Sequence, residues 1–299
     1  MGKKKERIKS DPILGDGLRK HSQWRDVWHR LTQNKLAMVA LVVVVLLILM
    51  CIFADVIAPY DYAEQDPTAK FQFPNAEHLL GTDNYGRDIL SRLIVGGRIS
   101  LLVSVLSVLF ALVVGGFIGA LAGYFAGTTD GIIMRLMDIL MAIPQFLLAV
   151  AVSVALGSGV VNTAIAIAIG SIPSYARLMR ASVMSIKDQE FTEAARALGN
   201  SNMSILFKHI IPNTLSPIIV ETTLHIGANI LAISGLSFVG LGVQPPTPEW
   251  GSIMAAGRQY IRDFWPLVTF PGVFIMLTMF GFNILGDGLR DAMDPKMKK

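Results

Sequence analysis

Residues 139–176 read ILMAIPQFLLAVAVSVALGSGVVNTAIAIAIGSIPSYA, a stretch of 38 residues without an Asp, Glu, Lys or Arg. A helix that crosses a membrane needs about 20 predominantly apolar residues, so this stretch has the length of two crossings. Gly157, Ser158 and Gly159 lie near its middle, and these residue types break helices and favour turns. The stretch therefore predicts two membrane-spanning helices joined by a tight turn.

Four further stretches lack charged residues, and each is long enough for one crossing. They are residues 36–54, 99–129, 222–248 and 264–286, with lengths of 19, 31, 27 and 23 residues. Composition agrees, because 53% of the 299 residues are hydrophobic and only 16% are charged, against about a quarter charged in soluble proteins. The sequence predicts an all-α membrane protein with about six transmembrane helices.

Positive charge is distributed unequally between the two sides of such a protein. With six crossings both termini lie on the same side, and that side carries 20 Lys and Arg residues against five on the other. Lys and Arg accumulate on the cytoplasmic side of membrane proteins. The count predicts a multi-pass protein of the cytoplasmic (inner) membrane with both termini in the cytoplasm.

This orientation divides the chain into one membrane domain with polar flanks. Residues 1–35 are expected to form a cytoplasmic N-terminal segment, residues 36–286 the six-span domain and residues 287–299 a cytoplasmic tail. Within the domain, residues 59–97 are expected to form a long outer loop, and residues 177–212 a cytoplasmic loop.

Two short segments outside the spans have the pattern of interfacial helices. The first lies before the first span, where apolar residues alternate with charged ones at helical spacing: Trp24, Val27, Trp28 and Leu31. Such a helix lies along the membrane surface. The second is a short apolar set within the outer loop: Ile89, Leu90, Leu93 and Ile94. Both are predicted to be amphipathic helices at the membrane surface.

Glycines recur at every fourth position along the second span, at Gly115, Gly119, Gly123 and Gly127. This spacing leaves one helix face almost without side chains, so that a neighbouring helix can approach closely. The alternative is that glycines are simply common in membrane helices. The regular register favours helix packing over chance, and this is a prediction about architecture rather than chemistry.

Two titratable residues lie on one face of the fifth span, Glu221 and His225, at i and i+4. A charge at the middle of the membrane costs roughly 3 kcal/mol by insertion scales. One interpretation is a position that lines a solute path or makes a polar contact between subunits. The other is that Glu221 lies shallow, near the cytoplasmic surface, and reaches toward water.

The cytoplasmic loop contains a short predicted helix. Residues 187–198 read KDQEFTEAARAL, and they are followed by Gly199, a natural helix stop. Its alanines give a smooth surface flanked by charges, which suits docking into a groove of another protein. An ordinary solvated connector helix is the alternative.

Three segments of the chain resemble the signatures of one transporter family. Glu193-Ala194-Ala195, Gly199 and Pro212 resemble the EAA loop of bacterial ABC importer permeases, although His209 and Ile211 depart mildly from the loop's usual ending. Residues 81–92 (GTDNYGRDILSR) and 286–295 (GDGLRDAMDP) look like the outer-loop and C-terminal signatures of the peptide/nickel subfamily. The resemblance covers nearly the whole chain and is strongest to the second (C-type) permease subunit of dipeptide and oligopeptide systems.

The resemblance implies a type I-like permease fold and a set of partners. These are a second homologous permease subunit, two cytoplasmic ATPase subunits and an extracytoplasmic solute-binding protein. It also implies an ATPase contact at the loop residues Glu190, Phe191, Glu193, Ala194, Ala195 and Gly199. The expected cargo is a dipeptide or oligopeptide, with nickel or a metal chelate as the alternative.

The sequence also lacks the motifs of several other functions. It contains no G-x-x-x-x-G-K-[ST], H-E-x-x-H or G-x-S-x-G, so we expect a transport subunit that is not an enzyme and has no ATPase site. The five His residues have no metal-ligand spacing, and no basic stripe indicates nucleic acid. Neither a cofactor nor a metal is expected. An ion-coupled secondary transporter remains a more distant alternative, and only Glu221–His225 would offer it the charges it needs.

Overall fold

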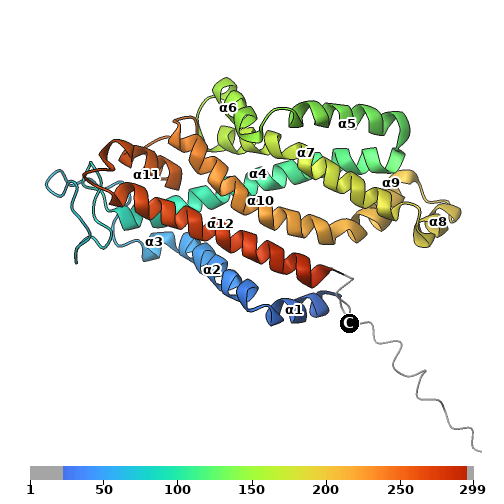
Figure 1. Cartoon of the computed structure of the whole chain (residues 1–299), viewed down its shortest axis with the longest axis horizontal. Coiled ribbons are helices and arrows are strands. Elements are labelled where there is room, and N and C mark those ends of the chain that lie inside the picture. Colours follow the sequence, from blue (N-terminus) through green and yellow to red (C-terminus); the bar gives the residue numbers. More distant parts are fainter. Residues whose placement is uncertain (1–22, 295–299) are drawn as a thin grey trace, which may run out of the picture.

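The computed structural model describes residues 23–294. Within these residues the regular elements are helices, joined by loops, with one isolated β-bridge between Thr82 and Asp88. Figure 1 shows the long helices side by side along one axis of the molecule. They are α2 (Lys35–Ile52), α4 (Ile89–Phe125), α7 (Val160–Ile186), α10 (Leu215–Phe238) and α12 (Pro266–Met293).

Shorter elements lie around and between these helices. In Figure 1 the outer loop, α3 and α11 lie at one end of the long axis, and α8 and α9 lie at the other. The short elements are α1 (Gln23–Gln33), α3 (Ala54–Ile57), α5 (Gly127–Met141), α6 (Gln145–Leu156), α8 (Glu190–Ala197), α9 (Asn202–Ile205), η2 (Leu206–Ile210), η3 (Ile211–Thr214), α11 (Trp250–Gly257) and η4 (Arg258–Tyr260).

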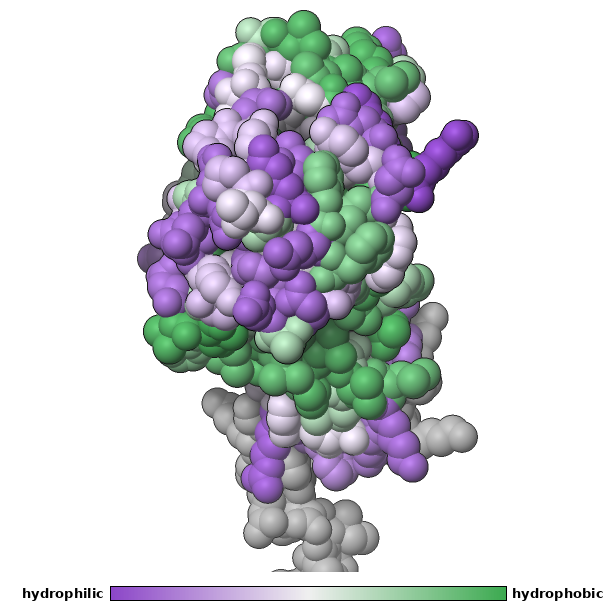
Figure 2. Space-filling view, turned by 90° about the vertical axis from the view of Figure 1, so that its left-hand side faces the viewer, coloured by the Kyte–Doolittle hydropathy of each residue, from purple (hydrophilic) through white to green (hydrophobic). Residues whose placement is uncertain are grey.

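The described part of the chain has four helical segments long and apolar enough to cross a membrane, or five if a bent pair counts as one. The four are α2, α4, the continuous stretch Asn202–Phe238 that ends with α10, and α12; the bent pair is α5 with α6. The remaining predicted crossing corresponds to α7, whose 27 residues include Arg177 and Arg180. The all-α membrane fold is confirmed, and six is roughly consistent with this count. Figure 2 shows a largely hydrophilic face at the end that carries the outer loop, flanked by hydrophobic residues.

The uncharged stretch 139–176 contains two breaks rather than one. The predicted turn is present, because α6 ends before Gly157 and α7 begins after Gly159, and both glycines have positive φ. A second break separates α5 from α6, whose axes differ by 87°. Pro144 precedes α6, and proline can neither donate a backbone hydrogen bond nor follow a helical residue comfortably. The predicted third crossing is therefore a bent pair that begins at Gly127, before the uncharged stretch, and not one straight helix.

The sequence predicted a separate interfacial helix for the outer-loop set that begins at Ile89. The structure has no separate helix there. The set forms the first two turns of α4, which begins at Ile89. Asp88 caps this helix, and its carboxylate accepts the Ser91 backbone N–H at 2.7 Å. Ile89 and Leu93 are completely buried against the rest of the chain, because α11 covers them: the indole Nε1 of Trp250 donates to the Leu93 carbonyl at 2.8 Å. The apolar pattern was correct, but it faces protein.

The predicted N-terminal amphipathic helix is present as α1. Trp24 and Trp28 are exposed, whereas Leu31 is buried against Ala37 of α2 and Ala292 of α12. The helix thus attaches to the bundle through one face and leaves its two tryptophans free on another. That arrangement fits a helix at a membrane surface, which stays a prediction.

Candidate functional site

The contact between α4 and α7 depends on the predicted glycine face. A Cβ atom on Gly115, Gly119 or Gly123 would collide with the α7 backbone at Ile172, Ala176 or Arg180, respectively. The two helices therefore touch through their backbones, which only glycine permits at such close approach.

Gly127 does not belong to this face, contrary to the sequence prediction. Helix α4 ends at Phe125, and the chain turns through Ala126 and Gly127, which both have positive φ. A Cβ at Gly127 would meet nothing within 4 Å. The spacing of four residues continues past the end of α4, so Gly127 permits a turn into α5 and plays no part in packing between α4 and α7.

The loop formed by residues 177–212 contains the predicted short helix, α8, which ends at Ala197 and is followed by Gly199 with φ of +80°. Its outer face exposes Glu190, Phe191, Glu193 and Ala194. Beyond it, Leu198 is 83% exposed, which is unusual for a large apolar side chain on a polar loop. This face is where a partner protein has access to the loop.

Ala195 was expected to share that accessible face, and the structure places it elsewhere. It is buried with Ile205, Leu206 and Ile210 of the segment that follows α8. The Asn200 side-chain amide also donates to the Ala195 carbonyl at 3.0 Å. Ala195 therefore anchors α8 to its own chain, while its neighbour Ala194 remains available to a partner.

Glu221 and His225 are brought together in the structure. His225 Nε2 lies 3.1 Å from Glu221 Oε1, with the Glu221 side chain 35% exposed and the His225 side chain 13% exposed. The His225 ring also lies against Tyr175 of α7, with ring centroids 5.1 Å apart. Among the described residues, His225 Nδ1, Tyr175 Oη and Thr222 Oγ1 are buried without a hydrogen-bond partner. The pair thus belongs to a polar patch between α7 and α10.

The outer-loop segment 81–92 is folded around buried charges. The Asp83 carboxylate accepts a hydrogen bond from Arg87 Nε at 2.7 Å and lies 3.6 Å from Arg92 Nε. Asp88 contacts His78 Nδ1 at 3.0 Å. These contacts explain the charged pattern as structure, and the described residues contain no cluster of three or more side chains suited to a metal ion.

Asp66 of the outer loop lies outside the membrane spans, and its carboxylate accepts hydrogen bonds from Thr68. The Thr68 hydroxyl donates to Asp66 at 2.6 Å, and the Thr68 backbone N–H donates to it at 2.8 Å. These bonds favour the charged form and hold the pKa of Asp66 below its usual value. The residue therefore remains charged at neutral pH.

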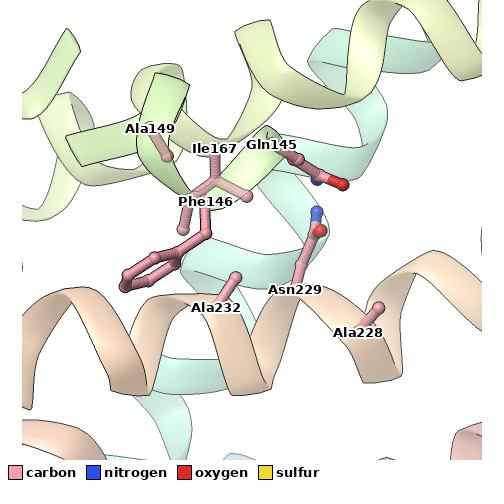
Figure 3. A pocket seen from close by; sticks show the side chains of 7 residues that line it. All are labelled: Gln145, Phe146, Ala149, Ile167, Ala228, Asn229 and Ala232. Atoms are coloured by element: carbon pink, nitrogen blue, oxygen red, sulfur yellow. The ribbon is translucent and has the colours of Figure 1, made fainter. Parts of the chain in front are cut away.

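One site that the sequence did not single out lies between α6, α7 and α10. It is a cavity of about 200 Å³, and Figure 3 shows the side chains around it. The lining residues are Gln145, Phe146, Ala149, Ile167, Ala228, Asn229 and Ala232. The signal available in the sequence was the pair of amides, Gln145 and Asn229, within otherwise apolar stretches.

Comparison with known families identifies what this bundle is. A family model described as "binding-protein-dependent transport system inner membrane component" matches residues 115–299, which include the glycine face, α8 and the cavity. A second, the "N-terminal TM domain of oligopeptide transport permease C", matches residues 22–74. The chain belongs to the binding-protein-dependent transport permeases. Both family assignments agree with the resemblance seen in the sequence motifs.

Curated relatives of this permease align over almost its whole length. It is 47% identical to the dipeptide transport system permease protein DppC of Alkalihalophilus pseudofirmus, over 93% of this chain and 91% of that protein. It is 44% identical to the di/tripeptide transport system permease protein DppC of Pseudomonas aeruginosa, over 93% of both. It is 46% identical to the glutathione transport system permease protein GsiD of Escherichia coli, over 92% and 91%.

A solved structure shares the fold of the permease. The MetNI methionine ABC transporter in an inward-facing conformation superimposes with a TM-score of 0.55 at 20% identity, covering 68% of this chain and 96% of that chain. At this identity the likeness concerns the fold alone. It confirms the expected ABC importer permease fold.

Proposed function

We propose that this permease forms one half of the membrane channel of an ATP-driven importer of small peptides. The observation that carries the proposal is the 44–47% identity, over more than nine-tenths of the chain, to permeases named for dipeptides, di/tripeptides and glutathione. These three cargoes have different side chains and share the peptide group. Small peptides are therefore the cargo class that fits all three relatives.

The proposed partners follow from what the chain does and does not carry. A second, related permease completes the channel, two ATPase subunits supply the energy, and a solute-binding protein delivers the peptide on the outer side. The sequence has no phosphate-binding loop of its own. ATP must then act through contact between subunits.

The exposed face of α8 is the proposed ATPase contact. This face combines two charged side chains with two uncharged ones: Glu190, Phe191, Glu193 and Ala194. Just after the end of α8, the exposed Leu198 adds an apolar side chain that a partner can contact. Because Ala195 is packed into the body of the permease, a push on this face is passed to the segment that leads into α10. ATP-driven closure would thereby bias the bundle between inward-open and outward-open states.

The polar patch around Glu221 and His225 has two proposed roles, a lining position on the cargo path or a polar contact with the second permease. Its exposure favours neither alone, because Glu221 is a third exposed while His225 is almost covered. An ion-coupled secondary transporter would need such charges, but it would leave the exposed face of α8 without a purpose. Nickel or a metal chelate remains the alternative cargo within the importer class.

Reconstitution tests the proposal directly. The permease would be co-purified with its genomic partner subunits and placed in proteoliposomes with the binding protein, and uptake of radiolabelled Ala-Ala would be measured with and without ATP. We expect uptake to need both ATP and the binding protein. Unlabelled peptides should reduce the uptake of labelled Ala-Ala, whereas nickel chloride should not. Uptake driven by an ion gradient without ATP would overturn the importer assignment, and competition by nickel alone would overturn the peptide cargo.

A further inference from the structure

The cavity between α6, α7 and α10 has one polar end and one apolar end. All seven residues that line it are uncharged. Figure 3 shows the amide groups of Gln145, from α6, and Asn229, from α10, on the same side of the cavity, with Phe146 on the other. A site of this composition suits a neutral, partly polar ligand.

The hydrogen bonds around Asn229 determine which group it has left to offer. The Ser107 hydroxyl donates its only hydrogen to the Ser104 carbonyl at 2.8 Å, so Ser107 Oγ can only accept from Asn229. Asn229 Nδ2 therefore donates to it, at 2.9 Å. That arrangement assigns the amide orientation and leaves Oδ1 as the free end.

Asn229 Oδ1 is a buried acceptor without a donor. The residue is 1% exposed, and Oδ1 has no hydrogen-bond partner within residues 23–294. Buried polar groups in folded proteins are almost always satisfied, and an exception requires an explanation. Asn229 lines the adjacent cavity, but Oδ1 itself is covered in this structure, so a ligand N–H in the cavity reaches it once the Asn229 side chain turns toward that space.

The cavity is kept open by small residues and held in shape by its neighbours. Ala228 and Ala232 of α10 face it, and Phe146 rests on Gly235, where a Cβ would come within 3.2 Å of the ring. Gln145 lies across the cavity from the Phe146 ring, and its position is held by a hydrogen bond in which its Nε2 donates to Ser171 Oγ at 3.0 Å. A Cβ on Gly170 would press on the Gln145 side chain. The space is therefore maintained by the packing around it.

We propose that this cavity is a station on the cargo path that binds one peptide group, with a peptide N–H donated to Asn229 Oδ1 and the adjoining side chain in the apolar half. The inference rests on the proposed function as a peptide importer. Pockets for drug-sized ligands have volumes of about 300–1,000 Å³, so a cavity of about 200 Å³ receives a segment of the cargo rather than all of it. Recognition of the shared peptide group accommodates cargoes with different side chains.

Asn229 also extends the row of polar side chains formed by Glu221 and His225 on α10. It follows His225 by four residues and Glu221 by eight, and residues at this spacing lie on nearly the same helix face. A peptide that moved along α10 would thus pass from one hydrogen-bonding side chain to the next. Neutral amides suit peptide groups better than metal ions, which prefer charged or imidazole ligands.

The test compares two cargoes in the complete reconstituted transporter. Uptake of tri-alanine is measured against its analogue methylated on both peptide nitrogens, which has no peptide N–H, in the wild type and in Asn229→Leu. We expect the wild type to take up tri-alanine faster than the methylated analogue. Asn229→Leu should lower the ratio of these two uptake rates by about tenfold, the usual effect of one buried hydrogen bond. Selection by the binding protein is common to both complexes and cancels in the comparison.

A second variant tests the cavity by its volume. Ala232→Trp should fill it and reduce tri-alanine uptake at least tenfold while the complex still assembles and hydrolyses ATP. Leu231→Trp is the matched control, because Leu231 is half exposed on the same helix and does not line the cavity. This variant also carries the test if Asn229→Leu does not assemble.

The outcomes separate the site from the function. If wild type carries tri-alanine while Asn229→Leu keeps the wild-type preference, or while an assembled Ala232→Trp complex transports normally, this site is wrong and the peptide importer stands. If the wild-type complex carries no peptide under ATP, the proposed function is wrong and this site is overturned with it.

Discussion

Gly119 of α4 lies directly against the backbone of Ala176 in α7, so closely that a methyl group on Gly119 would overlap the Ala176 carbonyl. The same relationship recurs one helical turn to either side, at Gly115 and Gly123. Between membrane helices the lipid supplies little hydrophobic driving force, so close van der Waals contact has a large share in holding two helices together. The glycine face is therefore a structural requirement of this permease.

The first prediction concerns this contact. Gly119→Ala should destabilise the permease by about 1–3 kcal/mol, because one added carbon must displace the α7 backbone, and Gly119→Leu should prevent assembly of the complex. Thermal unfolding of the purified complex in detergent measures the first effect. Gly116→Ala is the control, since a Cβ there meets only Met179 and Leu112 at ordinary contact distance. Equal melting temperatures for the two alanine variants would refute the packing role.

The second prediction distinguishes the two faces of α8. Glu193→Lys and Ala194→Trp should weaken co-purification of the ATPase subunits and reduce ATP-driven uptake at least tenfold, because both positions are exposed on the proposed docking face. Membrane insertion should be unaffected, since neither residue lies in a span. Normal ATPase binding by both variants would remove α8 from the interface.

Ala195→Trp provides the contrast. Because Ala195 is buried against Ile205 and Leu206, we expect the bulk to disturb the loop itself and to lower the melting temperature of the permease. The exposed-face variants should leave that temperature unchanged.

The third prediction concerns Gly199. Its φ of +80° belongs to the left-handed region, which costs most non-glycine residues roughly 1–2 kcal/mol. Gly199→Val should therefore distort the end of α8 and impair coupling, whereas Gly199→Asn should be tolerated, because asparagine enters this region readily. No Cβ contact would arise in either variant, so the difference isolates backbone strain. Uptake per hydrolysed ATP is the measurement, and identical coupling in both variants would contradict the argument.

The fourth prediction concerns Glu249, which is fully buried at the start of α11. Its carboxylate accepts the backbone N–H groups of Gly251 and Ser252 at 3.0 and 2.9 Å, and the Ser100 hydroxyl of α4 at 3.0 Å. Glu249→Ala leaves these donors unsatisfied and should cost at least about 1–3 kcal/mol. A lowered melting temperature checks this, with the exposed Glu64→Ala as control; no difference between them would mean that water replaces the carboxylate.

The fifth prediction concerns topology. A reporter fused after Lys299 should be cytoplasmic, and one inserted near Asn75 should be external, because 20 of the Lys and Arg residues lie on one predicted side against five on the other. Alkaline phosphatase and green fluorescent protein fusions report the two sides. An external C-terminus would reverse the orientation and place α8 on the wrong side for an ATPase.

The sequence alone determined the class of this protein. Long uncharged stretches dictate membrane helices, because an unpaired charge or backbone group is too costly in lipid, and this constraint acts locally along the chain. The motif at Glu193–Gly199 likewise predicted a helix and its stop from residues close in sequence, as α8 and the positive φ of Gly199 bear out. Local pattern was sufficient wherever the surroundings of a residue were set by the membrane or by its near neighbours.

Only the tertiary structure decided which faces meet protein. The apolar residues at Ile89 and Leu93 had the pattern of an interfacial helix until Trp250, more than 150 residues away, was seen to cover them. Ala194 and Ala195 are adjacent and chemically identical, yet one is exposed and the other buried. The cavity beside Asn229 requires three helices to converge. In each case the deciding partner is distant in sequence, and lipid and protein interior are so alike in polarity that hydropathy cannot distinguish them.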